Sequence, residues 1–127
     1  MKIQHAMVAG KLLPCFPCAG NKRPTTPHGF KDATSDPTAF VELCKRYPGP
    51  LIGVVTGERS NFDVLDIDDA GLAWFNDNDD RIPATRVHET RSGGRHLFFQ
   101  HQSGLRCSAS KIAADVDVRG DDGYVIW

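Results

Sequence analysis

The sequence predicts a small α+β domain in which a helix-containing first half is followed by a strand-rich second half. An apolar stripe at helical spacing runs from Phe40 to Tyr47, and a β-branched run at 62–67 indicates a buried strand. From residue 86 onward, apolar and polar residues alternate with the two-residue period of strands. With 127 residues, 40% of them hydrophobic, the chain can bury one modest core, so we expect a single domain over 1–127.

The beginning of the chain predicts little regular structure. Residues 1–11 are expected to form a short helix or a frayed end. Prolines make residues 12–17 an edge strand at best, because proline cannot donate to a strand ladder. Glycine and proline then interrupt residues 19–30, which we expect to form a long loop that carries two adjacent cations, Lys22 and Arg23.

One amphipathic helix follows this loop. Asp36 is a typical N-cap, and Pro37 suits the first helical turn. The apolar stripe that begins at Phe40 continues at positions i+3, i+4 and i+7, so it forms one face that packs on the core. The Pro-Gly-Pro segment at 48–50 ends the helix.

Two strands and a shorter helix come next. Residues 51–55 form an apolar run, and turn residues at 56–61 lead into the strand at 62–67, so we expect these two strands to pair with each other. Residues 70–75 predict a short helix, and the polar, acidic residues of 76–83 predict a surface loop.

The remaining strands follow from alternation and from turn residues. Four are expected, at residues 86–90, 95–100, 115–119 and 124–127. The segment 91–94 joins the first two, and 120–123 has the composition of a hairpin turn between the last two. Because the chain stops inside a strand on an apolar residue, we expect it to be a fragment, incomplete at its C-terminus.

Two acids at the end of the strand at 62–67 carry the first chemical signal. Side chains of a strand alternate between faces, so Asp66 and Asp68 share one face while Leu65 and Ile67 bury the other. Neighbouring carboxylates repel each other unless a cation lies between them. Oxygen ligands of this kind suit Mg²⁺ or Mn²⁺. The alternative is a strand that simply runs into an acidic turn.

A glycine-containing segment before the strand at 95–100 provides hydrogen-bond donors for a phosphate. Gly93 and Gly94 allow a close approach of backbone N–H groups to such a ligand. The side chains of Ser92, Arg95 and His96 add further donors.

A third strand carries charges of both signs. Asp115, Asp117 and Arg119 lie on one face of the strand at 115–119. A triphosphate bridged by metal to carboxylates needs acids, glycines and donors together. Each position also has a plain structural interpretation, because a strand histidine is commonly a core residue and an exposed acid–base pair is worth only about 0–1 kcal/mol.

The cysteines leave a metal-binding alternative open. Cys15 and Cys18 have the C-x-x-C spacing of zinc and redox sites, and with His28 and Cys44 they could make a Cys₃His zinc site. The gaps match no ligand spacing that we can defend, and the motif does not open a helix as a thioredoxin-like motif would. We therefore expect reduced, half-buried thiols.

Charge and hydropathy exclude several classes of protein. A formal net charge of −1 excludes binding of nucleic acid through overall basicity. Acids gather within 58–80 and bases along 86–119, which is the juxtaposition that a metal-plus-phosphate site needs. The sequence has no run of about 18 apolar residues that could span a membrane, and its start lacks an apolar signal segment, so we expect a cytoplasmic protein with no membrane partner.

Several blocks of sequence, including VLDID at 64–68 and TRSGGRHL at 90–97, occur in the order and spacing of a known family. The others lie at 14–17 with 21–24, 28–34 with 36–37, 52–57, and 116–120 with 123–125. Over about residues 12–127 the chain resembles the N-terminal catalytic domain of bifunctional DNA primase/polymerases (prim-pol), in the archaeo-eukaryotic primase superfamily.

The resemblance implies a fold and a set of site residues. It implies an RRM-like antiparallel sheet core beside a small N-terminal α/β module. It implies that Asp66, Asp68 and Asp117 hold the divalent metals and that His96 joins them as a catalytic residue. The nucleotide-binding residues that it implies are Ser92, Gly93, Gly94, Arg95, His96, Arg119 and Lys22.

The resemblance also implies an activity. A DNA primase/polymerase transfers nucleotides from NTPs or dNTPs to a primer or an initiating nucleotide on a DNA template, with Mg²⁺ or Mn²⁺ in a two-metal mechanism. The expected partners are the nucleotide, the DNA template and primer, and a helicase domain in the parent chain. The resemblance also implies a role in the replication of a phage or a plasmid.

Two alternatives stay open. The first is a catalytically degenerate module that binds nucleotide or nucleic acid. The second is a phosphatase of the haloacid dehalogenase type, in which Asp66 is the nucleophile and the acids at 121–122 form a later motif. That fold needs parallel strands alternating with helices, and no such alternation follows residue 86.

Overall fold

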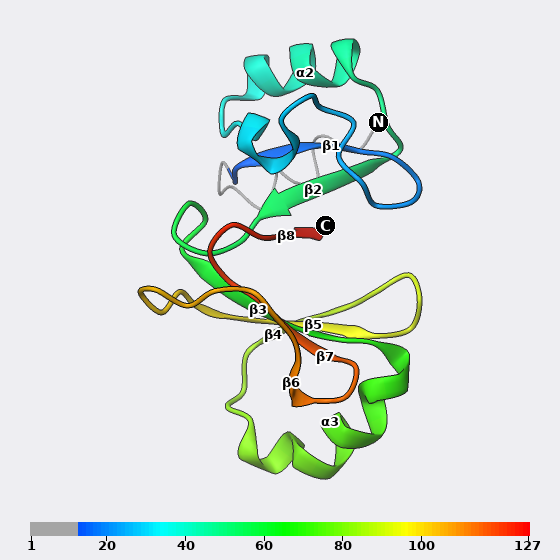
Figure 1. Cartoon of the computed structure of the whole chain (residues 1–127), viewed down its shortest axis with the longest axis vertical. Helices are drawn as coiled ribbons and strands as arrows, with labels where there is room; N and C mark the ends of the chain where they lie inside the picture. The colour runs from blue at the N-terminus through cyan, green and yellow to red at the C-terminus, as the bar shows by residue number, and fades with distance from the viewer. Residues whose placement is uncertain (1–12) are drawn as a thin grey trace. The chain divides into compact units, whose positions relative to one another are not determined.

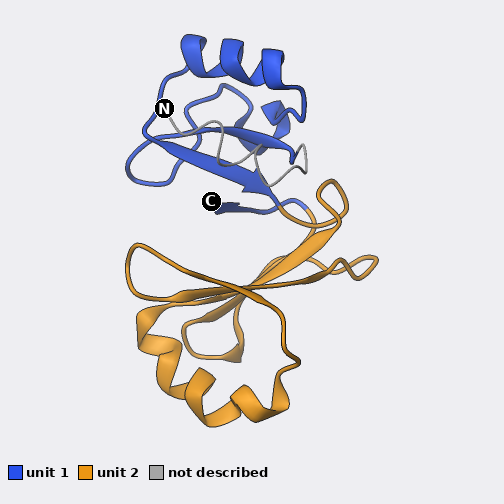
Figure 2. Ribbon diagram, turned by 180° about the vertical axis from the view of Figure 1, so that it is seen from behind, with its two compact units in different colours: residues 1–55, 122–127 blue, residues 56–121 orange. Residues whose placement is uncertain are grey.

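Two α-helices and eight strands, arranged in two antiparallel sheets, make up the computed structural model, which describes residues 13–127 (Figure 1). The predicted α+β class is confirmed. The helix or frayed end expected at 1–11 lies outside the described residues. The chain divides into two compact units, unit 1 with residues 1–55 and 122–127 and unit 2 with residues 56–121 (Figure 2).

Unit 1 is built on a three-stranded sheet with the order β1-β2-β8. Its strands are β1 (Cys15–Cys18), β2 (Leu51–Val55) and β8 (Tyr124–Ile126). The proline-containing strand β1 lies at one edge, as predicted, because Pro17 cannot donate to a ladder on both sides. The loop after β1 ends in a short 3-10 helix, η1 (Gly29–Asp32).

Helix α2 (Pro37–Arg46) runs over the sheet of unit 1, as Figure 1 shows. The side chain of Asp36 accepts a hydrogen bond from the backbone N–H of Ala39 at 3.3 Å, which confirms the predicted N-cap. Phe40 is fully buried and Leu43 packs against the core, so the predicted apolar face is also confirmed. The core below the helix contains Phe16, Cys18, Ala33 and Val55.

Unit 2 is built on a five-stranded sheet with the order β4-β5-β3-β7-β6. The strands are β3 (Phe62–Ile67), β4 (Arg86–Glu89), β5 (Arg95–Gln100), β6 (Ser108–Ala113) and β7 (Val116–Arg119). Strand β3 is central and antiparallel to both neighbours. Helix α3 (Leu72–Asn78) lies against one face of this sheet, flanked by two 3-10 helices, η2 (Asp69–Gly71) and η3 (Asp79–Arg81) (Figure 1).

The core of unit 2 lies between this sheet and α3. Ile67, Leu97 and Val116 form its buried centre, and the side chains of Leu72 and Phe75 pack against it from the helix. These three strand residues share the face opposite to Asp66 because side chains alternate along each strand. The predicted burial of Ile67 opposite the acids is therefore confirmed.

Two predicted strand pairings are wrong. Strand β2 pairs with β1 and β8, whereas β3 pairs with β5 and β7, so the strands at 51–55 and 62–67 belong to different sheets. The segment 120–123 is likewise no hairpin turn, since β7 joins the sheet of unit 2 and β8 joins the sheet of unit 1. Strand pairing is non-local, so short connections do not determine it.

Three further predictions differ from the structure. Strand β6 was not predicted, because its apolar residues do not alternate with polar ones and its ladder with β7 shifts register at a bulge. Helical structure continues from α3 through η3 into the segment 76–83, which we predicted as a loop. Asp115 precedes β7 in a left-handed turn with φ 62°, so it does not join the strand face of Asp117.

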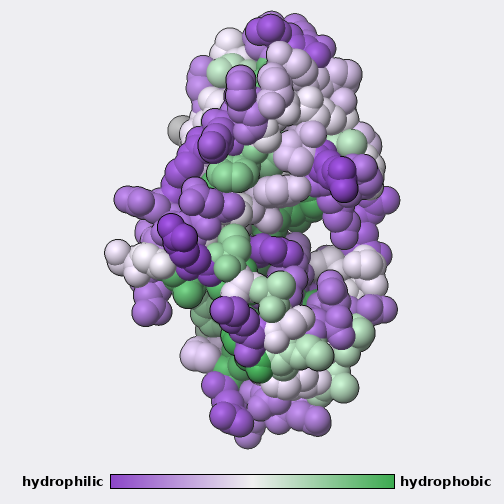
Figure 3. Space-filling view, in the orientation of Figure 1, coloured by the Kyte–Doolittle hydropathy of each residue, from purple (hydrophilic) through white to green (hydrophobic). Residues whose placement is uncertain are grey.

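Hydrophilic residues cover most of the surface of each unit on the face drawn in Figure 3, and apolar residues show only in small groups. The large apolar side chains that are exposed among residues 13–127 are Val87 and Ile112. No helix within that range has the length and apolar character needed to cross a membrane.

Candidate functional site

A row of polar side chains crosses three neighbouring strands of unit 2. Asp66 of β3 lies directly opposite His96 of β5 on one side and Asp117 of β7 on the other. Directly opposed residues of antiparallel strands project to the same face, so the three side chains lie together. The sheet therefore brings three of the predicted site residues into one row.

Salt bridges hold this row together. The Nε2 atom of His96 lies 3.2 Å from Oδ1 of Asp66. The Arg119 guanidinium lies 3.6 Å from Oδ2 of Asp66 and 3.2 Å from Oδ2 of Asp117, so one cation serves both carboxylates. The other oxygen of Asp117 accepts a hydrogen bond from the backbone N–H of Ser110 at 3.0 Å.

Asp68 extends the acidic group beyond the end of β3. Its backbone is still extended, with φ −67° and ψ 162°, so the alternation of side chains continues for one residue past the strand. Desolvation raises the pKa of the Asp68 carboxyl, and the negative charges of Asp66 and Asp117 raise it further, as do those of Asp115 and Asp69. Around Asp68, the negative charge of the acids is therefore greater than the positive charge of the neighbouring residues.

The loop between β4 and β5 packs tightly against the end of β3. A Cβ atom on Gly94 would overlap the carbonyl oxygen of Ile67 and would lie 3.2 Å from the Cα atom of Asp68. Gly93 has φ +92°, a conformation that other residues rarely adopt. These two glycines let the loop lie next to the acidic residues at the end of the strand.

Hydrogen bonds within this loop define its shape. Thr90 accepts from Gly93 N–H through its carbonyl (3.0 Å) and from Gly94 N–H through its hydroxyl (2.9 Å). Both glycine N–H groups that we expected near a phosphate therefore donate inside the loop. The hydroxyl of Ser92 lies 3.4 Å from that of Thr90.

Arg95 has a different environment from His96. As the next residue along β5, it projects to the opposite face of the strand, and its guanidinium donates to the carbonyl oxygens of Gly93 and Gly94 at 3.1 and 2.9 Å. It also lies 3.6 Å from a carboxylate oxygen of Glu89. In this structure Arg95 stabilises the loop, and its contact with a nucleotide stays a prediction.

Lys22 belongs to unit 1, in a left-handed turn with φ 73°. Its carbonyl accepts a hydrogen bond from the Tyr124 hydroxyl at 2.9 Å, which ties the loop after β1 to β8. The predicted contact of its ammonium group with a phosphate stays a prediction.

Sequence reasoning missed two parts of unit 2. One is Arg86, whose Nε donates to Nε2 of His88 at 2.9 Å on the strand beside His96. Desolvation lowers the pKa of His88, and the charges of Arg86 and His96 lower it further. The strand alternation at 86–89 was the available signal, since it places His88 on the face of His96.

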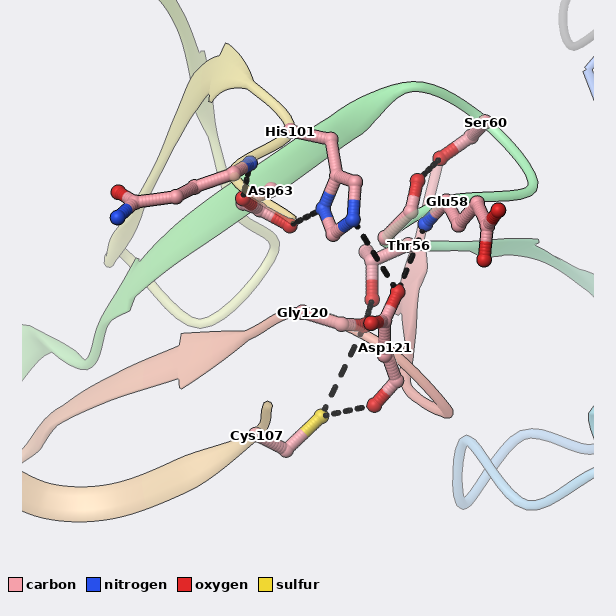
Figure 4. A network of polar contacts seen from close by, with 10 residues as sticks. Thr56, Glu58, Ser60, Asp63, His101, Cys107, Gly120 and Asp121 are labelled. Atoms are coloured by element: carbon pink, nitrogen blue, oxygen red, sulfur yellow. Dashed lines mark hydrogen bonds and ion pairs between the residues drawn. The ribbon is translucent and has the colours of Figure 1, made fainter. Parts of the chain in front are cut away.

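The other missed part is a buried network around His101 (Figure 4). Its imidazole lies between the carboxylates of Asp63 and Asp121. No local pattern indicates this contact, because Asp63 and His101 are 38 residues apart in sequence.

The cysteines form no such polar site. Within residues 13–127, no three His, Cys, Asp or Glu side chains form a group that could hold a metal, so the zinc alternative finds no support among the described residues. All four cysteines are free; Cys15 and Cys18 are fully buried and Cys44 is buried, whereas Cys107 is half-buried as predicted. Burial raises the pKa of Cys15 to about 12 and that of Cys18 to about 11, which keeps both thiols protonated.

The sheet also contradicts the phosphatase alternative. That fold needs β3 to lie in a parallel sheet, yet both of its neighbours are antiparallel. Asp121, which was to belong to a later acidic motif, instead forms an ion pair with His101 at 3.4 Å.

Comparison with known families adds one finding. The family model described as bifunctional DNA primase/polymerase, N-terminal, matches residues 5–127 of the chain. A comparison with curated proteins gives no match.

Proposed function

The chain belongs to the family of bifunctional DNA primase/polymerases, and we propose that it provides the nucleotidyl-transfer site of a DNA primase/polymerase. In this proposal it uses an NTP or dNTP to extend a primer, or an initiating nucleotide, on a DNA template. The residues 1–127 act as one catalytic domain, and a helicase domain in the parent chain is a further expected partner.

The observation that carries this proposal is the row formed by His96, Asp66 and Asp117, with the loop of Gly94 beside it. Acids from two neighbouring strands lie on one face, next to a loop that the glycines allow to approach closely. Nucleotidyl transfer requires this combination, because catalysis depends on positioning and on charge neutralisation rather than on a protein nucleophile.

The donor chemistry of the site fits Mg²⁺ or Mn²⁺. Asp66, Asp68 and Asp117 offer only carboxylate oxygens, which are the ligands that these hard cations prefer. Desolvation raises the pKa of Asp68, and repulsion from the neighbouring acids raises it further; a bound cation would relieve that repulsion. When bound there, the divalent cation would neutralise phosphate charge and orient the reacting oxygens.

The other residues of the site position these groups. His96 holds the Asp66 carboxylate through its Nε2 atom. Arg119 pairs with both Asp66 and Asp117, and we propose that its guanidinium moves to the triphosphate when the nucleotide binds. The hydroxyl of Ser92 is the side-chain donor of the neighbouring loop.

A second candidate function rests on the same arginine. Because Arg119 already pairs with two of the acids, a module that binds nucleotide without metal is also compatible with the geometry. Dependence of activity on metal separates the two functions.

Primer extension tests the proposal. We expect the chain to add dNTPs to a primed DNA template in the presence of Mn²⁺ and to lose this activity in Asp117→Asn, a variant that keeps the side-chain acceptor for Ser110 N–H. The control is Asp80→Asn, which removes an exposed acid in η3. Normal extension by Asp117→Asn would refute the assignment.

A further inference from the structure

Unit 2 buries an imidazole between two carboxylates, away from the candidate site (Figure 4). The side chain of His101 is only 9% exposed. Its Nδ1 atom lies 2.7 Å from Oδ1 of Asp63, and its Nε2 atom lies 3.4 Å from Oδ1 of Asp121. Asp63 is itself buried, so one of these contacts is shielded from water on both sides.

The surrounding contacts favour a charged imidazole. The other oxygen of Asp63 accepts from the N–H of Gln102 at 2.8 Å, and Asp121 Oδ1 accepts from the N–H of Glu58 at 2.9 Å. Both carboxylates are acceptors, so Nδ1 donates to Asp63, and Nε2 lies within ion-pair distance of Asp121. The imidazolium, with an N–H group on each nitrogen, satisfies both contacts. The hydrogen bond to Asp63 raises the pKa of His101, as do the charges of Asp63, Asp121 and Glu58, although burial opposes them.

The imidazole joins the three strands that carry the row of site residues. Asp63 lies on β3, His101 follows the last residue of β5, and Asp121 comes two residues after β7. Strand β3 lies between the other two in the sheet. The contacts of His101 therefore link the ends of the strands on which Asp66, His96 and Asp117 lie, whereas Asp63 itself projects to the face opposite Asp66.

Asp121 is held firmly by its own surroundings. Its backbone N–H donates to the carbonyl of Leu105 at 2.8 Å. The turn at Gly57 (φ +84°) packs so closely that a Cβ atom there would overlap Asp121. The preceding residue, Gly120, accepts a hydrogen bond from the buried Thr56 hydroxyl at 2.7 Å. A shift of the Asp121 carboxylate would therefore displace the backbone at the end of β7.

We infer that His101 is a positioning residue that, through its contacts with Asp63 and Asp121, holds β7 in register on β3 and so keeps Asp117 opposite Asp66. It does so from the opposite face of β3, without contacting a ligand at the candidate site. The effect on metal and nucleotide rests on the proposed function, whereas the effect on the strands does not.

Amide hydrogen exchange on the 127-residue chain tests the inference. Replacing His101 by Phe removes both contacts, and we expect the amides of β7 to exchange about tenfold faster or more, with those of β1 and β2 unchanged. Two further variants separate the contacts. His101→Gln can still donate to Asp121 from the position of Nε2, so it restores part of the protection of β7, whereas His101→Asn reaches only Asp63 and restores less.

The control variant is His28→Phe, which removes an exposed histidine of unit 1 whose Nδ1 atom lies 3.3 Å from Asp32. If His101→Phe does not fold, His101→Asn replaces it, because that variant loses the contact with Asp121 and keeps a polar side chain that can reach Asp63. Unchanged exchange of β7 in these variants, or equal exchange in the Gln and Asn variants, would overturn the inference.

Mn²⁺ titration separates this inference from the proposed function. We expect His101→Phe to weaken Mn²⁺ binding about three- to tenfold by displacing Asp117. If the wild-type chain binds no Mn²⁺ but the amides of β7 still exchange faster in His101→Phe, the positioning role is supported and the proposed metal site is not. Faster exchange with unchanged Mn²⁺ affinity would overturn the link between the strand register and the site.

Discussion

Asp66 of β3 and Asp117 of β7 lie directly opposite each other in the sheet, and one guanidinium pairs with both carboxylates. Two acids held this closely by backbone hydrogen bonds cannot separate to relieve their repulsion. Arg119 pairs with both carboxylates in the structure, and in the proposed active form a divalent metal would balance their charge.

Removal of Arg119 tests this exchange of cations. In Arg119→Gln, the carboxylates of Asp66 and Asp117 lose the guanidinium that they share, so we expect Mn²⁺ alone to bind about three- to tenfold more tightly. The same variant should bind a dNTP more weakly, because a charged donor to the triphosphate is lost. Calorimetric titration measures both affinities. Arg81→Gln, in η3, is the control, and weaker Mn²⁺ binding by Arg119→Gln would contradict the exchange.

Asp68 should destabilise the metal-free chain. Its carboxylate has a raised pKa because of desolvation and four neighbouring acids, so its ionised form is disfavoured in the folded state at neutral pH. Asp68→Asn should therefore increase stability by less than about 1 kcal/mol, since Asp68 is exposed and its charge is screened. Thermal unfolding without divalent metal measures the gain, and added Mn²⁺ should stabilise the wild type more than the variant. A lower melting temperature for Asp68→Asn would contradict this account.

Gly94 should tolerate no side chain. In Gly94→Ala, the new Cβ atom would overlap the Ile67 carbonyl, so either the loop or the end of β3 has to move, at a cost of about 1–3 kcal/mol. We expect a loss of nucleotide binding along with the loss of stability, both measured on the purified variant. Gly20→Ala is the matched control, because its Cβ atom would lie 4.0 Å from the side chain of Pro50. Equal stability of the two variants would show that the close packing at Gly94 is unimportant.

His101 should make stability depend on pH. Its pKa is raised in the folded chain, so its stabilising contribution is complete below the unfolded pKa of about 6.5 and is lost as pH rises through the folded value. The free energy of unfolding in urea should fall over that range in the wild type and fall less in His101→Gln. His28→Gln should keep the wild-type slope, because His28 is exposed. An identical slope in His101→Gln would contradict the charged state of the imidazole.

Local patterns predicted the parts of the fold that depend on neighbouring residues. The cap at Asp36, the apolar face at Phe40 and the alternation around Asp66 all follow from spacings of a few residues, and the structure confirms them. The row of His96, Asp66 and Asp117 was assembled from three such strands together with the family resemblance. Its register required the structure, because alternation specifies a face and not a partner.

The contacts that depend on distant residues could not be predicted in this way. The turn at 56–61 gave no sign that β2 and β3 enter different sheets. Strand β6 is bulged and its apolar residues do not alternate with polar ones, so it lacks the pattern that indicates a strand. The pairing of His101 with Asp63 joins residues that are unremarkable in their local sequence, and only the pairing of β3 with β5 brings them together.

The most direct test of the central claim is a calorimetric titration of a dNTP into the 127-residue chain, first with Mn²⁺ and then with a chelator. We predict binding that requires Mn²⁺ and that is lost in the Asp66→Asn/Asp68→Asn double variant, while circular dichroism shows that the variant stays folded. Binding that persists in the chelator, or no binding by the folded wild-type chain, would contradict the proposed metal-dependent nucleotide site.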